Sequence, residues 1–108
     1  METKIQKTLM QWFPEAFDKS KKYTEYEMLN VFAKYTQTLI RDDKGNKAEP
    51  FKIINLLYIK GNLHDKNAIE NEFFCPLAEN VSEGNLKEHL ELMPEEIRDV
   101  YIKTIIEN

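Results

Sequence analysis

The most apolar part of the chain runs from Phe51 to Leu77. Its first half is an almost unbroken apolar run that ends at Ile59, and its second half carries spaced apolar residues: Ala68, Ile69, Phe73, Phe74 and Leu77. A helix that is apolar nearly all round must be covered on several sides. We therefore predict a central helical hairpin, whose two helices are joined at residues 61–64.

Helix start signals place two further helices before this hairpin. Thr3 with Gln6 and Thr24 with Glu27 have the spacing of capping boxes, in which each side chain hydrogen-bonds the other residue's backbone N–H. The second of these helices should end in the turn at residues 42–46, where a glycine relieves the backbone.

The boundaries of the central hairpin follow from proline, glycine and short polar residues. Pro50 suits the first turn of its first helix, and Gly61 marks the end of that helix. Asp65 is the predicted N-cap of the second helix. We expect Pro76 to end or kink that helix, because proline lacks the N–H that a helix interior needs.

Two more helices follow, one capped by Ser82 or Asn85 and one opened by Pro94. The last carries an inward stripe at helical spacing, made of Ile97, Val100, Tyr101, Thr104 and Ile105. A length of 108 residues fits one domain. The sequence thus predicts an all-α single domain, residues 1–108, with five or six helices around the hairpin.

The chain has a net charge of −4, and its charged residues are distributed unevenly along the sequence. Residues 1–60 carry eleven basic and eight acidic side chains, whereas residues 61–108 carry four and eleven. An acidic half repels phosphate backbones, so we expect no nucleic-acid binding. It can attract a basic protein surface. The alternative is that these carboxylates only solvate helix faces.

No apolar run approaches the roughly 20 residues that a membrane span needs, and the first residues lack the apolar core of a signal peptide. The one cysteine, Cys75, cannot form an internal disulfide and fits a reducing compartment. We expect a cytoplasmic protein that does not enter membranes.

Candidate chemistry is sparse. Neither His64 nor His89 has a histidine or cysteine at metal-ligand spacing. His89 is predicted to be a partly exposed helix residue. His64 is predicted to lie beside a helix cap. The alternative for His64 is a weak metal site that it forms with Asp65 and with either Glu70 or a distant residue. Cys75 lies in an apolar segment, which keeps a thiol inert, and is predicted to be buried and structural. We therefore expect no cofactor, no metal and no catalytic residue.

The segment from Gly61 to Leu77, GNLHDKNAIENEFFCPL, resembles an element of small bacterial helical proteins. In that element a Gly-Asp turn is followed by Asn-Ala-Ile or Asn-Ala-Val, then Phe-Leu and a final Leu. Here Asn62 replaces the aspartate of the turn. Some of those proteins look like immunity proteins of toxin systems, which bind and block a toxin. The resemblance implies an inhibitor that acts by binding another protein.

The acidic half and this resemblance together predict a non-enzymatic protein-binding module with a basic partner protein. The candidate contacts are acidic side chains of the last two helices and an adjoining polar patch on the hairpin: Glu88, Glu91, Glu95, Glu96, Asp99, Asn67 and Glu70.

Two alternatives stay open. The first is a ligand-binding or enzymatic domain with a pocket between helices, which needs His64, Asp65 and either Tyr58 or Tyr101 to face one cavity. The second is a structural or regulatory subunit that dimerises through exposed apolar surface.

Overall fold

The computed structural model describes residues 2–79 and 81–107, and all regular secondary structure in this part of the chain is helical. The elements are α1 (Lys4–Trp12), a 3-10 turn (Pro14–Ala16), α2 (Glu25–Asp42), α3 (Glu49–Lys60), α4 (Leu63–Ile69), a π-helical turn (Glu70–Phe74), α5 (Cys75–Ala78), α6 (Glu83–Leu92) and α7 (Glu95–Glu107). Because α4, the π turn and α5 follow one another without a break, the described chain has six long helical elements, which confirms the predicted all-α fold.

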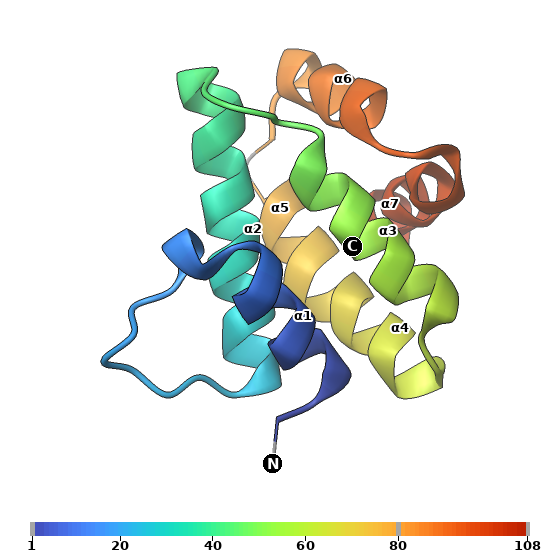
Figure 1. Ribbon diagram of the computed structural model, residues 1–108. Coiled ribbons are helices and arrows are strands. Elements are labelled where there is room, and N and C mark those ends of the chain that lie inside the picture. Colours follow the sequence, from blue (N-terminus) through green and yellow to red (C-terminus); the bar gives the residue numbers. More distant parts are fainter. Residues whose placement is uncertain (1, 80, 108) are drawn as a thin grey trace.

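The unbroken helical segment of residues 63–78, the central rod, runs between α2 and α3 (Figure 1). Its π turn and α5 both pack against α2 and α7, while α4 packs against α3. Phe73, Phe74 and Leu77 are fully buried in the rod. The second half of the predicted hairpin is therefore the centre of the fold.

The first half of the hairpin, α3, is covered on one side only. Phe51, Ile54 and Leu57 are buried, whereas Leu56 is 51% exposed and Ile59 is 47% exposed. The expectation that a helix this apolar is covered on several sides does not hold for the outer face of α3. The reason is that α4 and α7 pack along its inner face, and none of the described helices covers its outer face.

Capping boxes begin three of the helices. Those of Thr3 with Gln6 and Thr24 with Glu27 are confirmed. The third differs from the prediction, because Asn62 is the N-cap of α4 and Asp65 is its reciprocal partner in the box. An asparagine followed three residues later by a carboxylate satisfies two backbone N–H groups at once, whereas Asp65 as the N-cap would leave Asn62 outside the helix.

Pro76 lies inside the central rod because the preceding π turn makes room for it. A proline ring clashes with the carbonyl four residues earlier in a regular α-helix. The π turn inserts one extra residue, and the N–H of Cys75 accordingly donates to the carbonyl of Glu70, five residues back. The helix then continues to Ala78, so Pro76 distorts it without ending it.

Two turns use glycine for different reasons. After α2 the backbone is left-handed at Asp43 (φ 51°) as well as at Gly45 (φ 61°), so an aspartate shares the predicted role of the glycine. Gly61 ends α3 with an ordinary φ of −82°. A Cβ atom there would lie 2.6 Å from the carbonyl oxygen of Leu57 and 2.7 Å from the Cβ of Asp65. Close approach of α3 and α4, not backbone freedom, requires this glycine.

The outer helices complete the core. Ser82, not Asn85, caps α6. In α7, Ile97, Tyr101 and Thr104 are buried as predicted, whereas Trp12, the last residue of α1, is exposed. All of the α-helices contribute apolar side chains to one core. Within residues 2–79 and 81–107, none of the helices combines the length and the apolar character needed to cross a lipid bilayer.

Candidate functional site

The seven residues predicted to contact a partner lie in three parts of the fold. Asn67 and Glu70 belong to the central rod, two lie on α6, and three lie on α7: Glu88, Glu91, Glu95, Glu96 and Asp99. Their availability differs, because some of these side chains already bind other parts of the protein.

Glu70 joins the central rod to α3. Its carboxylate accepts a hydrogen bond of 2.6 Å from the hydroxyl of Tyr58, and the ammonium of Lys66 lies 5.6 Å from the centre of the same ring. Burial, together with the bond to the Glu70 carboxylate, raises the pKa of Tyr58. Glu70 is thus engaged within the fold, whereas Asn67, one turn earlier, is exposed.

Glu88 is engaged as well. The ammonium of Lys47 lies 3.0 Å from the carboxylate of Glu88 and 2.7 Å from that of Asp43, which holds the segment before α3 against α6. The hydrogen bond from Lys47 lowers the pKa of Asp43. These pairs are structural, so Glu88, like Glu70, is less available to a partner than the exposed acidic candidates.

The four remaining carboxylates, Glu91, Glu95, Glu96 and Asp99, are exposed and form what we call the acidic edge. Glu95 and Glu96 lie in the first turn of α7, where a negative charge complements the helix dipole. Glu96 accepts a long hydrogen bond of 3.4 Å from the amide of Asn55, which places the edge beside α3.

Arg98 is a basic residue within this region, and it is turned toward the protein. Its guanidinium donates to the carbonyl oxygens of Leu90 and Met93, each at 3.1 Å. These are carbonyls at the end of α6, where a positive charge is favourable. The hydrogen bonds of Arg98 therefore join α6 to α7.

An apolar ridge of Leu56 and Ile59 lies next to the acidic edge. The two side chains are three residues apart on α3 and share its outer face. Asn55, the partner of Glu96, directly precedes Leu56. Protein interfaces commonly combine an apolar centre with a polar rim, and this part of the surface offers both.

His89 is buried, not partly exposed as predicted. Its Nδ1 lies 2.9 Å from the hydroxyl oxygen of Tyr101, and its ring centre is 6.4 Å from that of Phe51. Burial lowers the pKa of His89, although the nearby Glu88 acts in the opposite direction. Burial raises the pKa of Tyr101. The sequence signal for the burial of His89 was its spacing of four residues from Met93, because residues four apart share one helix face and Met93 is buried.

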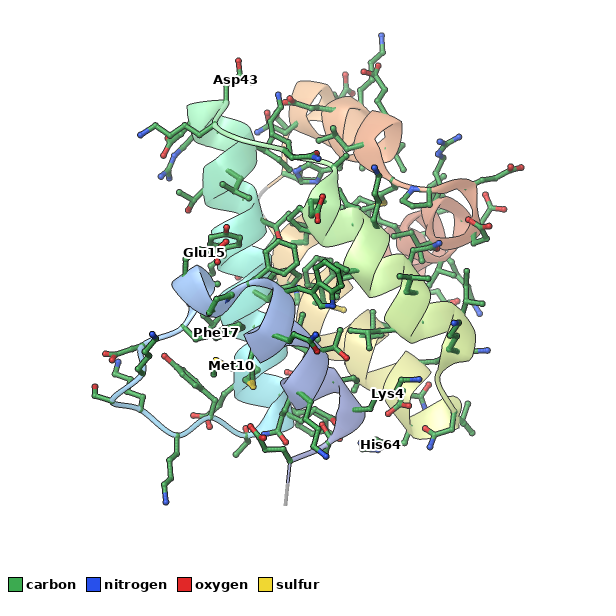
Figure 2. All side chains as sticks on the ribbon, viewed as in Figure 1. Lys4, Met10, Glu15, Phe17, Asp43 and His64 are labelled. Carbon is green, nitrogen blue, oxygen red and sulfur yellow. The ribbon has the colours of Figure 1, made fainter. Side chains whose placement is uncertain are left out.

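The pocket that the alternative of a ligand-binding or enzymatic domain requires, with His64 and Asp65 facing Tyr58 or Tyr101, does not form. Tyr101 is fully buried against His89, and Tyr58 is paired with Glu70. His64 lies at the lower end of the molecule (Figure 2) and contacts Glu25, with 2.9 Å between Nε2 and a carboxylate oxygen. Beside it is a shallow hollow of about 220 Å³, lined by Thr3, Thr24, Glu25, Tyr26 and His64.

Among the described residues, one group of potential metal ligands is close enough to share an ion. It consists of Glu25, His64 and Asp65, whose ligand atoms all lie within 4.8 Å of one another. The sequence suggested a weak site of His64 with Asp65 but gave no sign of Glu25, which is 39 residues from His64 in the chain. Only the packing of α2 against α4 brings them together.

A second hollow, of about 440 Å³, lies between the end of the central rod and α7. It is lined by Asn71, Cys75, Pro76, Ala78, Glu79, Thr104 and Ile105. Cys75 lines this hollow and is half-buried, so the prediction of a buried cysteine was wrong. The residue directly follows the π turn.

Comparison with known proteins identifies a family but no characterised relative. A family described as a domain of unknown function, DUF7674, matches residues 7–107. The comparisons with curated proteins and with solved structures both find no match. Because the match spans nearly the whole chain, the protein belongs to the DUF7674 family.

Proposed function

We propose that this protein is a non-enzymatic binding domain whose partner is a protein with a basic surface. The observation that carries the proposal is the acidic edge of Glu91, Glu95, Glu96 and Asp99 beside the apolar ridge of Leu56 and Ile59. Exposed carboxylates steer and select an oppositely charged partner, and exposed aliphatic side chains supply contact area that excludes water.

The finer form of this proposal is an inhibitor of the immunity type, which binds and blocks a basic toxin in the cytoplasm. It is supported by the resemblance of Gly61–Leu77 and by the excess of acidic side chains in residues 61–108. A toxin-like reading frame next to the gene in several genomes is the expected context. Its consistent absence would count against the inhibitor but not against protein binding.

The direct test is affinity capture of a partner, followed by binding measurements at low and high salt. The double charge reversal Glu95→Lys with Asp99→Lys should weaken binding more than about tenfold, because it places like charges against the basic partner. The matched control, Glu2→Lys with Glu79→Lys, changes the net charge equally at exposed positions away from the edge. A partner that binds both variants and the parent chain equally would overturn the proposal.

Self-association into a dimer through the apolar ridge is the second candidate function. Two copies that buried Leu56 and Ile59 against each other would bring two acidic edges together, and that repulsion would weaken with added salt. Sedimentation of the chain over a range of concentrations separates the two functions. A dimer that strengthens with salt supports self-association, and a monomer throughout excludes it.

A further inference from the structure

Glu25 is a buried carboxylate near the starts of α1, α2 and α4. It is the first residue of α2, and the hollow beside it is lined by the capping residues Thr3 and Thr24. Its side chain is only 9% exposed. A carboxylate this far from water needs partners for both oxygens.

Only one of the two oxygens has such a partner within the described chain. Oε1 contacts Nε2 of His64 at 2.9 Å, whereas Oε2 is buried and makes no hydrogen bond there. A buried acceptor without a partner is unfavourable, and more so when it is charged. The position therefore favours an additional positive ligand over the carboxylate alone.

We propose that Glu25, His64 and Asp65 bind one divalent transition-metal ion of the Zn²⁺ type. Their ligand atoms lie within 4.8 Å of one another, and in a tetrahedral zinc site neighbouring ligand atoms are about 3.3 Å apart. The difference is a small side-chain adjustment, which the His64 side chain, 60% exposed, is free to make. An imidazole combined with carboxylates favours zinc over calcium or magnesium, which prefer oxygen ligands alone.

The surroundings hold the ligands in place. The backbone N–H of Asn62 donates to one oxygen of Asp65 at 3.2 Å, which orients this carboxylate and leaves its other oxygen for the ion. The ring of Tyr26 stacks on that of His64, with 6.2 Å between ring centres. Three protein ligands at the rim of a hollow leave a fourth position for water.

The electrostatic balance also favours a cation. The starts of α1, α2 and α4 each present the equivalent of about half a positive charge, which opposes a metal ion. Glu25 and Asp65 supply two full negative charges, so their attraction exceeds the combined effect of the three helix ends. The exposed side of the cluster gives an ion access from solvent.

The test is titration of the full chain, without a histidine tag, with zinc chloride in a calorimeter. One ion should bind per chain, and His64→Asn and Glu25→Gln should each weaken binding by more than about tenfold, since even outer partners of metal ligands contribute that much. Glu83→Gln, an exposed carboxylate on α6, and His89→Gln, the other histidine, are matched controls that should leave zinc affinity unchanged. Circular dichroism verifies that each variant is folded.

A second measurement identifies the ligands if a variant fails to fold. In the parent chain, zinc should shift the ring nitrogen resonances of His64 and leave those of the buried His89 in place. Replacement of zinc by cobalt should give the intense visible absorption of a four-coordinate ion. No heat of binding with excess zinc, or binding that leaves the His64 ring unshifted, would overturn the proposal.

Discussion

Both faces of α3 carry large apolar side chains, but the two faces have opposite surroundings. Phe51, Ile54 and Leu57 face the core and are buried, while Leu56 and Ile59, from the same short run, face away from it. The difference arises from the neighbours, since α4 and α7 pack along one face only. Apolar character alone therefore does not determine which side chains hold the protein together and which are left for a partner.

The inner face should be the more sensitive of the two to truncation. Ile54→Ala removes a fully buried side chain and leaves a cavity, so it should lower the free energy of unfolding by about 2–5 kcal/mol. Ile59→Ala, the matched change on the outer face, should alter it by less than about 0.5 kcal/mol. Urea unfolding followed by circular dichroism measures both. Equal losses would mean that the outer face is covered.

The junction of α3 with α4 should tolerate no added side chain. In Gly61→Ala the new methyl group would lie 2.6 Å from the carbonyl oxygen of Leu57, so we expect a loss of about 1–3 kcal/mol in unfolding free energy. Gly84→Ala is the control, because a Cβ at Gly84 meets no atom within 4 Å and alanine favours the helix. Thermal unfolding of the two variants should shift in opposite directions.

Burial of His89 against the inner face should make stability depend on pH. The folded pKa lies below the ordinary value of 6.5, so the unfolded chain binds a proton first as the pH falls. This contribution to stability is complete above about pH 6.5 and is lost as the pH falls through the folded pKa. His89→Gln keeps a polar group beside Tyr101 without this titration. Its unfolding free energy should fall less steeply over the same range, and an unchanged slope would assign the effect to other groups.

The outer face should matter for binding more than for stability. Leu56→Ala should change the unfolding free energy by less than about 0.5 kcal/mol, because the side chain is already half exposed. If the ridge forms the centre of an interface, the same change should weaken partner binding by more than about 1 kcal/mol. Ile106→Ala truncates a more exposed side chain near the end of α7 and serves as the control. Equal binding by all three chains would remove the ridge from the interface.

Features that depend on four or five consecutive residues were the ones that the sequence predicted best. The capping boxes that begin at Thr3 and Thr24 lie within one helical turn, and both form as expected. The choice of Asp65 over Asn62 failed because the two residues are the two halves of one box. A local pattern predicts such a box but does not always identify which of its members is the cap.

Features that depend on packing were harder to predict. The burial of His89 follows from the position of Tyr101 on another helix. The contact of Glu25 with His64 joins residues far apart in the sequence. The engagement of Glu88 by Lys47 likewise removes one candidate from the acidic edge through a distant partner. Periodicity along one helix carries no information about which other helix lies opposite.

The π turn at Glu70–Phe74 has a consequence for comparing members of the family. An extra residue rotates every later side chain of that helix by about 100° relative to an unbroken spiral. A relative without a proline at the position of Pro76 has no steric need for that insertion. We expect such relatives to be one residue shorter here, so an alignment without a gap would match the residues after the turn with the wrong neighbours.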